Sequence, residues 1–84
     1  MKLILIISGS CLSCKAAHDI WLTTCQSYDI KLSTWDFENE TGKNIAEQLD
    51  IKSFPALINN KKIIAVGCPN AATAKKIIKQ LLNS

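Results

Sequence analysis

The chain has 84 residues, 48% of them hydrophobic, and a formal net charge of +3. This length supports one domain with one small core, over residues 1–84, and the hydrophobic fraction is too high for a disordered chain. All ten basic residues are lysines, and they are spread along the sequence. Because arginine usually reads bases and clamps phosphates, this composition argues against a nucleic-acid-binding protein.

The apolar run at residues 3–7 resembles the start of a lipoprotein signal only superficially. A secretory signal needs an apolar core of about 7–15 residues, and a membrane span needs about 20. A short run of leucine and β-branched residues without alternation instead predicts a strand over residues 2–8, covered on both faces. We therefore expect a cytoplasmic protein with no membrane contact.

A helix is predicted next, over residues 12–28, because apolar side chains recur there at spacings of three and four: Cys14, Ala17, Trp21, Cys25 and Tyr28. A second strand follows over residues 30–37. Thr41 is the expected N-cap of a short second helix. The inward face of that helix comprises Ile45, Ala46 and Leu49.

The last part of the chain predicts a hairpin and a third helix. Pro55 opens a strand over residues 54–58, Asn59–Asn60 forms the turn, and Gly67 closes a strand over residues 63–66. Asn70 is the expected cap of a helix whose buried face comprises Ala74, Ile77, Ile78, Leu81 and Leu82. The order is β-α-β-α-β-β-α, an α/β fold in which the first two strands are parallel with a right-handed crossover.

The stretch SGSCLSCKAAH places Cys11 and Cys14 two residues apart at the start of the first helix. Such a pair serves as a structural disulfide, half of a zinc site, ligands of an iron–sulfur cluster, or a redox dithiol. In a reducing cytoplasm a catalytic or metal-binding pair is expected rather than a structural disulfide.

A zinc site needs further ligands, and the chain offers His18, Cys25 and Cys68. Cys25 lies about 16 Å beyond Cys14 along the helix, too far to share one metal, and its position predicts a small buried hydrophobe. His18 is expected on the helix surface, where it could also tune the neighbouring thiols. A redox dithiol requires only the pair, because the positive end of the helix dipole stabilises a thiolate at Cys11 while Cys14 lies one turn inside.

Four features together resemble the thioredoxin superfamily at its short, glutaredoxin-like end. They are CLSCK after the first strand, LDIKSFPALI, NNKKIIAVGC and the amphipathic C-terminal helix. The resemblance implies a thioredoxin-like fold, with a four-stranded mixed sheet flanked by three helices. It covers nearly the whole chain.

The same resemblance implies a role for each matching residue. Cys11 corresponds to the nucleophile and Cys14 to the resolving cysteine, which together form a redox-active disulfide with no bound cofactor. Pro55 corresponds to a proline whose peptide bond is cis and which faces the pair. The backbone of Phe54 corresponds to the position that pairs with an extended substrate, and Gly67 to a glycine that leaves room beside the site.

The chain also departs from the family pattern. Ser10, Leu12 and Ser13 replace the Trp, Gly and Pro of many thioredoxins, and the first strand has no Asp to accept a proton from the second cysteine. Cys68 is the unusual residue, because it directly follows Gly67, where the family resemblance implies that the chain passes close to the nucleophile. It is interpreted either as a loop residue ahead of the last helix or as an accessory redox thiol.

The sequence therefore predicts a small monomeric thiol–disulfide oxidoreductase. Its expected partners are proteins that carry disulfides and a flavin- or NADPH-dependent reductase that recharges the pair. The alternative is a non-enzymatic module that uses Cys11 with Cys14 or Cys68 to hold a soft metal or an iron–sulfur cluster.

Overall fold

The computed structural model describes residues 2–9 and 13–83. The predicted order of elements is confirmed, although most boundaries shift by one or two residues. The strands and helices are β1 (Lys2–Ile7), α1 (Cys14–Ser27), β2 (Lys31–Asp36), α2 (Glu40–Gln48), β3 (Ala56–Asn59), β4 (Lys62–Val66) and α3 (Ala71–Leu82).

The four strands form one mixed sheet in the order β2-β1-β3-β4. β1 and β2 are parallel, with Leu5 opposite Thr34, as expected for two strands joined through a helix. β3 runs antiparallel to β1, and β4 pairs with β3 in a hairpin. The predicted α/β fold with a four-stranded mixed sheet and three helices is therefore confirmed.

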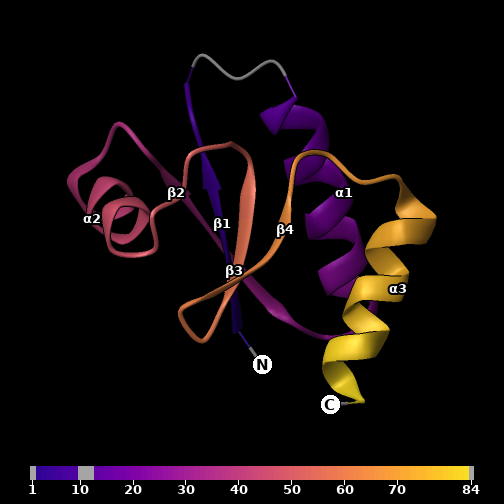
Figure 1. Ribbon diagram of the computed structural model, residues 1–84. Coiled ribbons are helices and arrows are strands. Elements are labelled where there is room, and N and C mark those ends of the chain that lie inside the picture. Colours follow the sequence, from indigo (N-terminus) through magenta and orange to yellow (C-terminus); the bar gives the residue numbers. More distant parts are fainter. Residues whose placement is uncertain (1, 10–12, 84) are drawn as a thin grey trace.

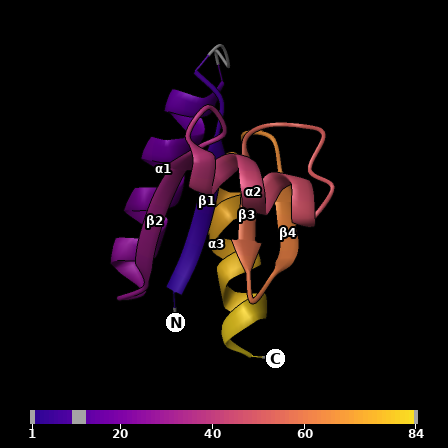
Figure 2. The same cartoon turned by 90° about the vertical axis from the view of Figure 1, so that its left-hand side faces the viewer.

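Three layers make up the molecule, with the sheet in the middle (Figure 1). Helices α1 and α3 cover one face of the sheet, and α2 covers the other, as the turned view in Figure 2 also shows. Side chains of β1 alternate between the two cores, with Leu3 and Leu5 in the first and Ile6 in the second. Burial on both faces explains why this strand is apolar throughout.

The larger core lies between the sheet and helices α1 and α3. Trp21 is its largest side chain and is 1% exposed. The face predicted for α1 is correct, because Cys14, Ala17, Trp21 and Cys25 are all buried. On α3, Ala74 and Ile78 are fully buried, but Leu82 is 47% exposed, so its assignment to the buried face was wrong. Leu82 is the last residue of α3, where few neighbouring side chains can cover it.

The smaller core lies under α2, where Ala46 and Ile51 meet Ile6 and Ile58 of the sheet. Gly42 allows the close approach of α2 to the end of β2. A Cβ at position 42 would lie only 2.1 Å from the carbonyl oxygen of Asp36, a clash that only glycine avoids.

Three predictions concern two helix N-caps and the hairpin turn, and the structure confirms one of them. The side chain of Asn70 caps α3 as expected, accepting a hydrogen bond of 2.8 Å from the Thr73 amide. Thr41 is not an N-cap, because α2 begins at Glu40 and Asn39 occupies the capping position. The hairpin turn is Asn60–Lys61 rather than Asn59–Asn60: both residues have positive φ, and Asn59 still pairs with Lys62.

Candidate functional site

The predicted site residues gather at one end of the sheet. β1 ends there, α1 begins there, and the segments before β3 and after β4 lie at the same end, away from both termini (Figure 1). Residues that are distant in the sequence meet in this way where neighbouring strands begin or end on the same side of the sheet. The fold thus brings Cys14, Pro55, Gly67 and Cys68 to the same end of the molecule.

Cys14 is the first residue of α1, and its side chain is 4% exposed. Burial of this second cysteine agrees with the sequence prediction. Cys11, together with Ser10 and Leu12, lies outside the described residues. The role of Cys11 as nucleophile and its disulfide with Cys14 therefore stay predictions.

The start of α1 has a positive electrostatic character. Its first turn contains no acidic side chain, whereas Lys15 follows Cys14 directly. The dipole of this 14-residue helix also favours negative charge at this end. These features stabilise an anion next to the N-terminus of α1, such as a thiolate.

A pocket opens beside Cys14, between α1 and the sheet. Its lining comes from residues 7–9 at the end of β1, from Thr34 of β2, and from Cys14, Lys15 and His18 of α1. His18 was expected on the helix surface, and its side chain is indeed 35% exposed, but it also shares this pocket with Cys14. The sequence pattern did not reveal Thr34. The signal that could have revealed it is the parallel register, which places Thr34 beside Leu5.

Pro55 has the conformation that the family resemblance implies. The Phe54–Pro55 peptide bond is cis, and the proline side chain is fully buried. The Phe54 ring packs at a tilt against Phe37, with 4.9 Å between ring centroids. This contact fixes the large side chain of Phe54 on the α2 side of the sheet.

Gly67 lies directly beside this proline, since its amide donates a hydrogen bond of 2.8 Å to the Pro55 carbonyl oxygen. Its φ of +88° is a backbone conformation that favours glycine. No described atom lies within 4 Å of the position that a Cβ would take. The open space agrees with the expectation that Gly67 leaves room, while the backbone conformation gives a separate reason for glycine.

The two further cysteines differ in environment, and both are free. Cys25 is fully buried in the larger core, as predicted, and burial raises the pKa of its thiol above the ordinary value of 9.0. Cys68 is exposed directly after Gly67, and its thiol lies 3.6 Å from the Pro69 carbonyl oxygen. Cys68 is therefore the accessible thiol of the two.

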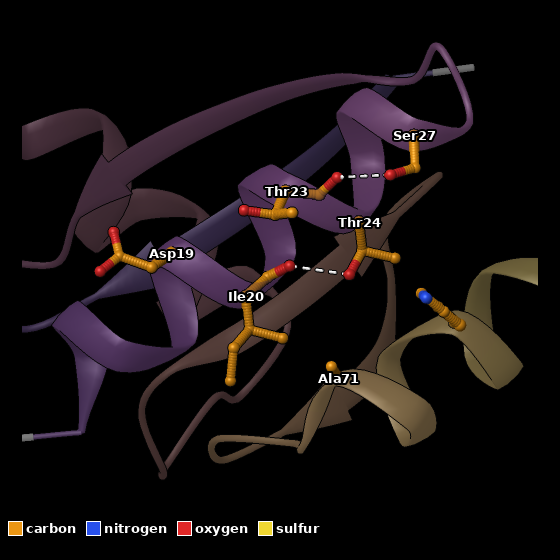
Figure 3. Close-up of a pocket in the computed structure, with 7 residues that line it drawn as sticks. Asp19, Ile20, Thr23, Thr24, Ser27 and Ala71 are labelled. Carbon is orange, nitrogen blue, oxygen red and sulfur yellow. Dashed lines mark hydrogen bonds between the residues drawn. The ribbon is translucent and has the colours of Figure 1, made fainter.

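A second pocket lies between α1 and α3, near Ile20, Thr24 and Ala71 (Figure 3). Two of its hydroxyl groups are used within α1: Thr24 donates to the Ile20 carbonyl oxygen at 2.8 Å, and Ser27 donates to that of Thr23 at 3.1 Å. Such bonds hold the hydroxyls against the helix backbone rather than toward a ligand.

The part of the chain that the structure describes was searched for metal sites and for membrane-spanning helices. Within residues 2–9 and 13–83, no three His, Cys, Asp or Glu side chains are grouped closely enough to hold a metal ion. No helix in that part of the chain combines the length and apolar character needed to cross a membrane.

Comparison with solved structures identifies the fold. Thioredoxin 1 from Thermosipho africanus aligns with a TM-score of 0.75 at 18% identity, covering 99% of this chain and 96% of that one. Thioredoxin from Trypanosoma brucei brucei gives 0.76 at 14% identity, with 99% and 75% covered. Thioredoxin O2 from Arabidopsis thaliana gives 0.73 at 17%, with 95% and 73% covered.

No protein-family model matches the sequence, and no curated protein matches it either. The structural likeness nevertheless extends over almost the whole chain. The chain therefore has a thioredoxin-like fold, and the resemblance to the thioredoxin superfamily is confirmed at the level of the fold. The finer likeness to glutaredoxins stays a prediction.

Proposed function

We propose that the protein is a small thiol–disulfide oxidoreductase that exchanges its Cys11–Cys14 pair with disulfides of protein substrates. The observation that carries this proposal is the position of Cys14: it is buried at the first turn of α1, at the end of a thioredoxin-like sheet where the cis Phe54–Pro55 bond and Gly67 also lie. A shielded second thiol at a helix start is what a resolving cysteine requires.

The proposed reaction has two steps. The Cys11 thiolate, stabilised by the positive end of α1, attacks one sulfur of the substrate disulfide and forms a mixed disulfide. Cys14 then attacks the Cys11 sulfur, and the substrate leaves as a dithiol. The pair becomes a disulfide, so two electrons pass to the substrate and no bound cofactor is needed.

The segment before β3 and the turn after β4 supply the proposed substrate surface. The Phe54 backbone would pair with an extended substrate segment that packs beside Pro55, and the open space beside Gly67 would admit it. Cys68 lies at the rim of this surface as an exposed thiol, so it is the candidate accessory thiol. We further propose a cytoplasmic monomer that a flavin- or NADPH-dependent reductase recharges.

The competing function is a binding module for a soft metal or an iron–sulfur cluster, held by Cys11 with Cys14 or Cys68. The exposure of Cys68 at the same end of the sheet is the feature that favours it. Thiolate ligands select such metals, and a cluster would give the protein visible colour.

Insulin reduction by dithiothreitol, followed by turbidity, tests the proposal. The purified protein should be colourless and metal-free and should accelerate the reaction, whereas Cys11→Ser should reduce the rate to that of dithiothreitol alone. Cys25→Ala serves as the matched control, because Cys25 lies in the core away from the proposed site. A coloured or metal-loaded protein without reductase activity would support the binding module instead.

A further inference from the structure

We propose that His18 accepts the proton of Cys14 when Cys14 displaces the reduced substrate. The inference rests on the proposed function and adds a general base to the two cysteines. The need for such a group follows from chemistry: only a thiolate attacks a disulfide, and apolar surroundings disfavour a thiolate. A thiol as buried as Cys14 therefore needs a base nearby at the moment of attack.

The helix places His18 where this base is needed. Residues four apart on a helix lie on the same face, one turn from each other, and Cys14 and His18 have this spacing on α1. Both line the pocket between α1 and the ends of β1 and β2. Because the His18 side chain is 35% exposed, it reaches from the pocket to solvent and can pass the proton to water.

The other polar groups around the pocket are unsuited to the task. Lys15 lines the pocket, but a lysine ammonium is a hydrogen-bond donor with no acceptor lone pair. Ser8 and Thr34 carry hydroxyls, which are weak bases. No Asp or Glu is among the described residues that line the pocket. Histidine is the side chain that most often serves as a general base, so His18 fits the role.

Two carboxylates lie near the pocket without lining it. Oδ1 of Asp19 is 3.7 Å from Nδ1 of His18, so this carboxylate lies beside the imidazole ring. The Glu38 carboxylate lies about 3.1 Å from the position of a Cβ on Gly9, at the end of β1. Both carboxylates attract the positive charge that His18 would carry after the proton transfer, while the Lys15 ammonium repels it.

The step balances within the protein and its substrate. In the mixed disulfide, the Cys14 thiol gives its proton to the imidazole of His18, and its sulfur forms a bond to the Cys11 sulfur. The bond between Cys11 and the substrate sulfur breaks, and that sulfur leaves with the electron pair. The leaving thiolate takes a proton from the imidazolium or from water, so no further reductant is involved.

Single-turnover kinetics with 5,5′-dithiobis(2-nitrobenzoate) separate the two steps. Attack by Cys11 releases one thionitrobenzoate and leaves a mixed disulfide, and attack by Cys14 releases the second. Mass spectrometry of acid-quenched samples follows the mixed and the internal disulfide. All variants carry Cys68→Ser, so that the exposed third thiol adds no signal.

In the parent protein, the second step should speed up with rising pH between pH 5 and 8. His18→Gln should slow this step by about 10²-fold or more, since general bases contribute about 10²–10⁴, and should change its pH profile, because only hydroxide or water is then left to take the Cys14 proton. The first step should keep its rate. Gln26→Ala, an exposed change on the same helix, should behave like the parent in both steps.

Rescue distinguishes a proton acceptor from a merely structural residue. Free imidazole should restore part of the second-step rate in His18→Ala, with a matching dependence on imidazole concentration. A second step that is equally fast and has the same pH profile in His18→Gln would overturn the role of His18. If the parent protein itself performs neither step, the proposed function fails, an outcome that is independent of His18.

Discussion

The contrast between Cys25 and Cys68 gives a quantitative prediction about thiol reactivity. Cys25 is 0% exposed in the larger core, so a reagent reaches it only after the chain opens. Stability of natural domains is at least about 0.05 kcal/mol per residue, or about 4 kcal/mol for a chain of this length. At about 1.4 kcal/mol per factor of ten, the open state is then about 10³-fold rarer than the folded one. Cys68 is exposed and needs no opening.

The assay uses a Cys11→Ser/Cys14→Ser variant, in which only these two thiols remain. Reaction with 5,5′-dithiobis(2-nitrobenzoate) should show one equivalent released at the rate of a peptide thiol and one released at least about 10³-fold more slowly. Adding Cys68→Ser should remove the fast phase, and denaturant should make both thiols fast. Two phases that differ by less than about tenfold would show that Cys25 is not in a cooperative core, and would refute this account of α1.

Three further predictions concern stability. Gly42→Ala should destabilise the fold by about 1–3 kcal/mol in urea unfolding, because its Cβ would strike the Asp36 carbonyl oxygen 2.1 Å away. Asn70→Ala should cost about 1 kcal/mol by removing the cap on the Thr73 amide, while Asn70→Ser should cost much less; equal losses would argue against the cap. Burial raises the pKa of Cys25 above its ordinary 9.0, so the unfolded chain releases this proton first as pH rises. The stability from the neutral thiol is thus complete below pH 9.0 and is lost above it, and Cys25→Ala should show a smaller fall in unfolding free energy over that range.

Local periodicity was enough to predict most of the fold. The spacing of Ala17, Trp21 and Cys25 identified the buried face of α1, and the unbroken apolar run of β1 identified a strand covered on both sides. Asn70 was identified as a cap because its side chain acts within three residues of itself. Helix faces, buried strands and helix caps depend on residues that are close in the sequence, so they can be predicted from the sequence alone.

The errors arose where a neighbouring element decides the outcome. Leu82 fits the helical period, but at the last position of α3 it stays 47% exposed. The turn moved to Asn60–Lys61 because the pairing of Asn59 with Lys62 sets the hairpin register, a property of two strands together. A lysine with positive φ could not be inferred from residue preferences alone.

Some features of the candidate site could likewise be predicted from the sequence, and others required the structure. The family motif was enough to predict the cis Phe54–Pro55 bond and the open space beside Gly67, whereas the hydrogen bond from the Gly67 amide to Pro55 came from the structure. The pocket shared by Cys14, His18 and Thr34 required the three-dimensional arrangement, because Thr34 comes from a separate strand. A polar residue on an edge strand carries no sequence signal that distinguishes a site from a solvated surface.

The measurement that tests the central claim most directly is the trapping of a mixed disulfide. The reduced Cys14→Ser variant, mixed with a disulfide-bearing protein such as insulin, should accumulate a covalent adduct. Dithiothreitol should cleave this adduct by reducing its disulfide. Peptide mapping should place the adduct on Cys11, and the unchanged protein should release its substrate without accumulating one. An adduct confined to Cys68, or none at all, would contradict an exchange reaction carried by the Cys11–Cys14 pair.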